Sequence, residues 1–135
     1  MKNSIKAIVA VGAFALTFPS LAEVVVVVNP ANGATSMKKD EVAQYFLGKS
    51  TVLMAVDQPE ATAIHTEFYK KVADKDPSQL KSLWSKLVFT GKAMPPMEAA
   101  DSAAVKKMVA ANPKAIGYIE RSAVDATVKV VLTAP

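Results

Sequence analysis

The run Val24-Val25-Val26-Val27-Val28, closed by Asn29-Pro30, decides how this sequence folds. Five β-branched residues in succession favour a strand, and the run has the length of a strand rather than of a helix. Because no polar residue interrupts it, both faces of the strand must be covered, as in parallel sheets that carry helices on each side. The run therefore predicts a doubly buried strand within an α/β domain.

Helical and strand signals alternate after this run. The clearest helix start is Asp76-Pro77-Ser78-Gln79, which supplies a cap, a first-turn proline and a capping-box glutamine in order. Similar signals predict helices over about 36–47, 57–73, 76–90 and 102–111, a loop over 91–98, and further strands over 51–56, 116–119 and 128–132. This order predicts a three-layer α/β fold around a small, mostly parallel sheet flanked by helices.

The segment before the valines has the features of a secretory signal peptide. Lys2 and Lys6 give the start its positive charge, and residues 7–16 form an apolar run. The small residues Ser20 and Ala22 then form the expected cleavage site. The apolar run is shorter than the roughly 20 residues that span a bilayer. We therefore expect a cleavable signal over 1–22, one domain over 23–135 and a periplasmic location; an uncleaved anchor is the alternative.

Composition excludes several classes of function. Without the signal, 14 Lys and Arg stand against 12 Asp and Glu, and no basic run exceeds two residues, which gives no argument for nucleic acid. The absence of cysteine excludes disulfides and cysteine zinc sites. His65 is the sole histidine of the chain, and no catalytic or nucleotide-binding motif occurs. We expect no enzyme, no cofactor, no metal and no membrane span after signal removal. His65 is expected at the boundary of a helix's apolar face, with ligand contact as the alternative.

Several motifs, taken together, resemble type II periplasmic solute-binding proteins, in particular the phosphate-binding subunit of ABC uptake systems. The matching stretches are Phe46-Leu47-Gly48-Lys49, Phe68, Trp84, Phe89-Thr90-Gly91-Lys92 with Pro95-Pro96, and Asn112-Pro113-Lys114-Ala115-Ile116-Gly117-Tyr118. The resemblance covers most of residues 30–119 and corresponds to the second lobe alone of the family's two lobes. It implies one lobe of that fold, phosphate or a similar small oxyanion as ligand, and an ABC permease or a homodimer as partner.

The chain departs from the family's binding pattern in two respects. It lacks the length for the first lobe, and Ala55, Pro59 and Ala61 stand where the family has Arg, Ser and Thr, with Thr62 one position away. An alternative function follows from both departures. The domain is then an envelope protein–protein interaction module that keeps the fold without the ligand.

The candidate ligand site is the start of the helix expected to begin at Asp57. The first N–H groups of a helix attract anions, so Glu60, Ala61 and Thr62 are the expected backbone donors, while Asp57 and Glu60 serve equally well as helix-capping acids. Three further candidates surround this turn in the predicted fold. They are Tyr118 beside Gly117, and Asn29 and Asn32 after the first strand, where strand ends of open α/β sheets bind ligands; turn formation accounts for both asparagines equally well.

Overall fold

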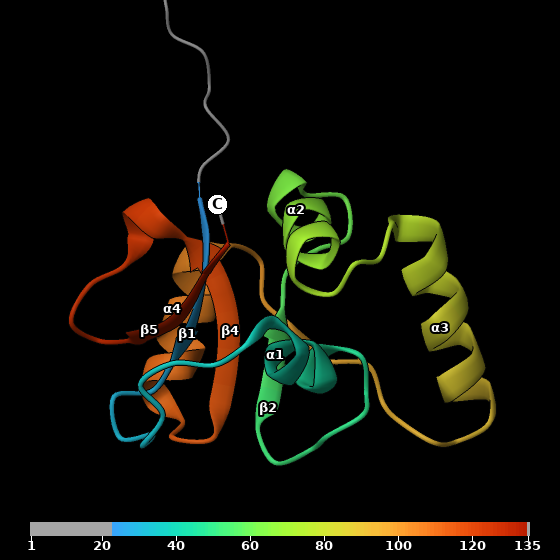
Figure 1. Cartoon of the computed structure of the whole chain (residues 1–135), viewed down its shortest axis with the longest axis horizontal. Helices are drawn as coiled ribbons and strands as arrows, with labels where there is room; N and C mark the ends of the chain where they lie inside the picture. The colour runs from blue at the N-terminus through green and yellow to red at the C-terminus, as the bar shows by residue number, and fades with distance from the viewer. Residues whose placement is uncertain (1–22, 135) are drawn as a thin grey trace, which may run out of the picture.

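The computed structural model describes residues 23–134, so the predicted signal peptide lies outside the described residues. The elements follow the expected alternation of strands and helices (Figure 1). They are β1 (Val24–Val28), α1 (Lys39–Phe46), β2 (Met54–Asp57), α2 (Ala63–Val72), α3 (Pro77–Phe89), β3 (Met97–Glu98), α4 (Ser102–Ala111), β4 (Ala115–Glu120), a short 3-10 helix (Arg121–Ala123) and β5 (Lys129–Ala134). The α/β prediction is confirmed.

The five strands form one mixed sheet in the order β3-β2-β4-β1-β5. β2 runs parallel to β3 and β4, whereas β1 pairs antiparallel with both β4 and β5. Four strands thus share one direction and β1 alone runs against them. The sequence predicted a mostly parallel sheet with β1 in a parallel environment, and for β1 this was wrong. The five valines indicate that both faces of the strand are buried, but burial does not determine whether a strand runs parallel or antiparallel to its neighbours.

The alternation of side chains along β1 builds both cores. Val24, Val26 and Val28 belong to the cluster beneath α1 and α2, while Val25 and Val27 pack with α4 on the other face. All five are at most 1% exposed, and each contributes roughly 1.5–3 kcal/mol relative to an exposed valine. The doubly buried strand is confirmed.

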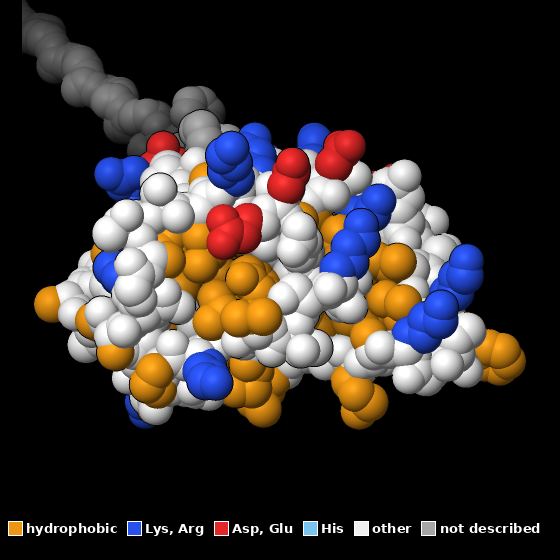
Figure 2. All heavy atoms as spheres, turned by 60° about the horizontal axis from the view of Figure 1, so that its bottom comes forward, with side chains coloured by type: hydrophobic (Ala, Val, Ile, Leu, Met, Phe, Trp, Pro, Cys, Tyr) orange, Lys and Arg blue, Asp and Glu red, His pale blue; other side chains and the backbone are white. Residues whose placement is uncertain are grey.

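Helix α3 lies at one side of the molecule, beyond α1 and α2 (Figure 1). Its start is the predicted one: Asp76 accepts from the Gln79 N–H, and the Gln79 side chain accepts from the Asp76 N–H. However, only Leu80 of its apolar stripe is buried, whereas Trp84 is half-buried. Apolar side chains therefore remain visible on the adjoining face (Figure 2).

Two other helix starts differ from the sequence prediction. Helix α1 begins at Lys39 after Lys38 rather than at Thr35 or Ser36, and α2 begins at Ala63 with Thr62 as its cap rather than at Asp57. Asp57 is instead the last residue of β2. The helix start at Asp57 was wrong because this carboxylate is used in the core, as described below.

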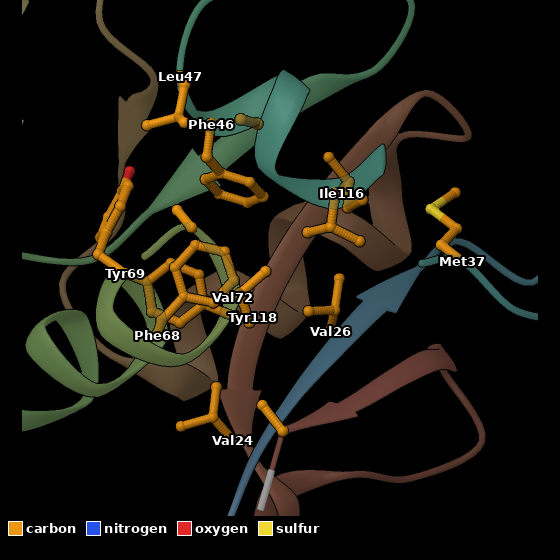
Figure 3. Close-up of a cluster of buried hydrophobic side chains, with 14 of the residues drawn as sticks. Val24, Val26, Met37, Phe46, Leu47, Phe68, Tyr69, Val72, Ile116 and Tyr118 are labelled. Carbon is orange, nitrogen blue, oxygen red and sulfur yellow. The ribbon is translucent and has the colours of Figure 1, made fainter. Parts of the chain in front are cut away.

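Aromatic rings hold the core above the sheet (Figure 3). The rings of Phe68 and Tyr118 stack with their centroids 4.0 Å apart, and Phe46 meets Phe68 edge-on at 4.7 Å. Such pairs add about 0.5–1.5 kcal/mol each beyond the area that they bury. They fix α1 and α2 against β4 and thereby position the end of β4.

None of the described helices is both long enough and apolar enough to cross a membrane. The described residues also contain no group of three or more His, Asp or Glu side chains arranged to hold a metal ion.

Candidate functional site

The candidate site lies at the edge of the sheet where the parallel strands β2 and β4 end. β2 finishes at Asp57, and Tyr118 lies near the end of β4. A turn over residues 58–62 then leads into α2, whose cap Thr62 accepts from the His65 N–H at 3.3 Å and donates its hydroxyl to the Pro59 carbonyl at 2.7 Å. This is the edge at which open α/β sheets bind ligands.

Asp57 is buried and is held by three hydrogen-bond donors. One carboxylate oxygen accepts from the Tyr118 hydroxyl and from the Gln58 N–H at 2.8 Å, and the other accepts from the Tyr69 hydroxyl at 2.6 Å. A carboxylate inside a protein is costly unless such donors replace water. The tyrosines therefore account for an acid at a position that is only 9% exposed.

The two tyrosine hydroxyls stay protonated in this environment. Burial, followed by the negative charge of Asp57, raises the pKa of Tyr118 far above its ordinary value of 10.0. The same two causes, in the same order, raise the pKa of Tyr69. Both phenols therefore act as donors to Asp57 over the whole neutral range.

Gln58 ties this edge to the opposite face of the sheet. Its side-chain amide donates to the Tyr118 carbonyl at 2.9 Å and to the Ser102 hydroxyl at 3.3 Å, and so joins β2 to β4 and to the start of α4. The Gln58 N–H also donates to the Tyr118 hydroxyl at 3.2 Å. Gln58 is therefore fixed by hydrogen bonds from both its backbone and its side chain, and Asp57 by hydrogen bonds to its carboxylate.

His65 stands beside this network in the first turn of α2. Its Nε2 lies 3.8 Å from an Asp57 oxygen, and its ring rests on Tyr69 with the centroids 4.6 Å apart. The residue is only 5% exposed, yet Nδ1 has no hydrogen-bond partner among the described residues. A buried ring nitrogen without a partner is costly.

A cavity of about 610 Å³ opens between this edge and α3. Asp57, Gln58, Glu60 and His65 line it from the side of β2 and α2. The wall contributed by α3 is mainly apolar, and its residues include Leu80, Lys81, Trp84 and Val88. The cavity therefore combines a polar end with an apolar side.

The structure brings five of the seven candidate residues to this one edge. Asp57 and Glu60 line the cavity, Ala61 and Thr62 belong to the turn before α2, and Tyr118 is buried beneath Asp57. The Thr62 N–H is already used, because it donates to the Pro59 carbonyl at 3.0 Å.

Asn29 and Asn32 lie at the opposite end of the sheet, because β1 runs against β2 and β4. The Asn29 amide donates to the carbonyls of Val109 and Ala110, both at 3.0 Å, and thus closes the end of α4. The Asn32 side chain accepts from the Ala34 N–H at 2.8 Å. Both asparagines therefore shape local structure, which was the alternative interpretation of their position.

Three residues of the network around Asp57 were not predicted from the sequence. Tyr69, Gln58 and Ser102 all belong to the network, and only Tyr69 offered a signal. It lies four residues after His65, so the two share one side of α2. An aromatic residue with a polar tip at that spacing from a lone histidine could have indicated a buried polar cluster.

A comparison of the sequence with protein-family models gives no match, and neither does a comparison with curated proteins. Solved structures do match. An ABC-type phosphate transport receptor from Vibrio cholerae superposes with a TM-score of 0.63 at 17% identity, over 82% of this chain and 45% of the receptor. A putative phosphate ABC transporter substrate-binding protein with bound phosphate, from Clostridium perfringens, gives 0.65 at 18% identity, over 82% and 44%. PstS from Borrelia burgdorferi gives 0.62 at 9% identity, over 82% and 46%.

The chain thus spans less than half the length of the phosphate-transport proteins that it resembles. At these identities the likeness concerns the fold. This structural likeness agrees with the single-lobe resemblance that the sequence motifs indicated. The chain has the α/β fold of about half of a phosphate-transport binding protein.

Proposed function

We propose that this chain is an exported, one-lobe binding module for a small oxyanion of the phosphate class, held where β2 ends and α2 begins. The observation that carries the proposal is His65, whose Nδ1 is buried and unpartnered among the described residues beside a cavity at the start of a helix. The fold is shared with solved structures of two phosphate ABC transport proteins, one of them with bound phosphate, and with those of PstS and of a possible phosphate binding protein.

Two side chains would donate to the oxyanion, and a helix start would attract it. His65 would donate from Nδ1, and Lys81 would approach from the α3 wall of the cavity. The start of α2 would add the positive end of its helix dipole. Glu60 and Glu98 also line the cavity. Because they are acceptors, they favour an oxyanion that keeps a proton, such as hydrogen phosphate, over a fully ionised anion such as sulfate.

A single lobe covers less of a ligand than two lobes do, so the site requires a second surface. The partner in this proposal is an ABC permease or a second copy of the chain, which would close the open side of the cavity. We also propose that residues 1–22 are a signal peptide that directs the chain to the periplasm. This part of the proposal rests on the positively charged start, the apolar run and the small-residue cleavage site of that segment.

Thermal unfolding of the chain from Glu23 onward tests this function. Phosphate at 100 times its dissociation constant should stabilise the protein by about 2.7 kcal/mol, which is a rise of several degrees in Tm for a domain of this size. Sulfate at equal ionic strength should give a smaller rise. His65→Phe should remove the phosphate effect, and Lys107→Gln, on the exposed side of α4, should keep it.

A Tm that does not respond to millimolar phosphate would contradict the proposal. It would favour the second candidate function, an envelope protein–protein interaction module. The observation in support of that candidate is that Asp57 already has three donors from within the chain. Light scattering of the purified protein with and without a periplasmic extract would then report the complex.

A further inference from the structure

We infer that an exposed apolar surface of this protein, which adjoins the candidate site and extends to the start of β2, docks onto an anionic phospholipid membrane. Among residues 23–134, six large apolar side chains remain exposed, and all six fall within two short segments, residues 52–54 and 88–97. They are Val52, Met54, Val88, Phe89, Met94 and Met97, and together they are called the docking patch.

The two segments lie side by side in the fold. Met54, Val88, Met94 and Met97 line one cavity of about 710 Å³, which joins the start of β2 to the loop after α3. Met54 is the first residue of β2 and Asp57 the last, so this part of the patch lies at the end of the strand opposite the candidate site. Val88 and Phe89, however, also line the candidate-site cavity, and Met97 pairs with Val56. The docking patch therefore adjoins the candidate site along α3 and β3.

The most prominent members project into solvent. Phe89 is 91% exposed, Met94 84% and Val52 72%. Figure 2 shows apolar side chains standing out along the lower margin of this face. Apolar residues that project in this way are suited to entering the boundary between lipid headgroups and acyl chains.

Basic and acidic residues border different sides of the patch. Lys92 lines the same cavity as the methionines, and Lys81 and Lys86 share a surface depression with Phe89. Asp57, Glu60 and Glu98 border only the side where Val88 and Phe89 line the candidate-site cavity. No Asp or Glu occurs over residues 77–97 or 47–56. In Figure 2 the acidic side chains lie in the upper half of the face, and apolar side chains project along its lower margin.

This charge distribution selects the occupant. Two copies of the chain facing each other through the patch would bring lysines against lysines, which opposes self-association. An anionic lipid surface attracts each of them. Apolar projections combined with basic residues are the two contributions by which proteins attach to membranes without spanning them.

Vesicle flotation with the chain from Glu23 onward tests the inference, since this part contains all five strands and four helices and lacks the apolar segment 7–16. We expect binding to vesicles that contain phosphatidylglycerol and weak binding to pure phosphatidylcholine. Phe89→Ser combined with Met94→Ser should lower the partition coefficient about tenfold or more. Lys86→Gln combined with Lys92→Gln should also lower it about tenfold or more, on phosphatidylglycerol vesicles alone.

The matched control is Lys70→Gln combined with Lys107→Gln, which removes the same charge from α2 and α4 outside the patch. Circular dichroism of every variant checks that the fold is kept. Equal binding to both kinds of vesicle, equal losses in the control and the patch variants, or no vesicle binding at all would each overturn the inference. A dimer in light scattering that Phe89→Ser dissociates would assign the patch to a second copy instead.

Discussion

Asp57 carries two conflicting sequence signals, one for the start of a helix and one for the end of a strand, and only the second agrees with the structure. It stands before Gln58-Pro59-Glu60, which is a good helix-start pattern, and after an apolar strand. In the fold it ends β2, and its carboxylate faces inward to Tyr69 and Tyr118. Hydrogen bonds to a charged group contribute about 1.5–3 kcal/mol each, more than a helix cap on a surface turn. The tertiary network therefore prevails over the local capping signal.

The two tyrosines predict how stability depends on alkaline pH. Because folding raises the pKa of both phenols, the folded protein keeps their protons while the unfolded chain releases them above about pH 10. Their contribution is complete below that pH and is lost as the pH rises above it. The free energy of unfolding should fall by about 1.4 kcal/mol per pH unit for each tyrosine.

Urea unfolding at a series of alkaline pH values measures this slope. Tyr118→Phe keeps the ring that stacks on Phe68 and should remove about half of the slope attributed to the two tyrosines. It should also cost about 1–3 kcal/mol at neutral pH, because Asp57 loses a donor. An alkaline slope that is the same in the parent and in Tyr118→Phe would show that this phenol titrates alike in the folded and unfolded states.

At the scale of elements, β4 and α4 meet at Gly117 with no room for a side chain. A Cβ there would lie 2.5 Å from Val105 Cγ1 and 3.3 Å from Val109 Cγ2. We expect Gly117→Ala to destabilise the protein by about 1–3 kcal/mol through overpacking. Combining it with Val105→Ala should recover part of that loss, which a double-mutant cycle in urea would measure.

Gly33→Ala is the control for this prediction, because no other atom lies within 4 Å of the position of its Cβ. Its free energy of unfolding should stay within about 0.5 kcal/mol of the parent. If Gly117→Ala behaved in the same way, the close approach of α4 to β4 would be wrong.

The elements that could be predicted from the sequence are those whose structure depends on their own residues rather than on distant parts of the chain. The start of α3 was predicted down to the Asp76–Gln79 capping box, and β1 was predicted as doubly buried from its own five valines. The direction of β1 could not be predicted, because it depends on β4 and β5, which lie far along the chain. The strand β3, with only Met97 and Glu98, is too short to show a period and was expected to be loop.

The candidate site was predictable in the same partial way. The sequence indicated the turn after β2, since residues 57–62 carry acids, a proline and a hydroxyl at the end of a strand. It placed Asn29 and Asn32 at the same edge because it assumed a parallel β1, and that error of direction moved both to the wrong end of the sheet. His65 became informative only when its burial and its unpartnered Nδ1 could be seen.

For the whole molecule, these observations describe a gradient of packing from one side to the other. β1 is covered by α1 and α2 on one face and by α4 on the other, and it pairs with a strand on each edge. Helix α3, at the far side, has one buried residue, and a cavity adjoins it on each flank. The candidate site lies between these extremes, with a rigid wall from β2 and α2 and a less tightly packed wall from α3.

Hydrogen exchange should show this gradient directly. Amides open locally with free energies that follow the buried contacts of their element, so those of β1 and β4 should exchange last and those of α3 should exchange first among the four helices. A ligand held between His65 and Lys81 would join the two walls, so saturating phosphate should slow exchange in α3 more than in α4. Asp76→Ala, which removes the cap of α3, should speed exchange in that helix and leave β1 unchanged. If α3 instead exchanged as slowly as β1, the helix would be a fixed part of the core and the cavity beside it a rigid one.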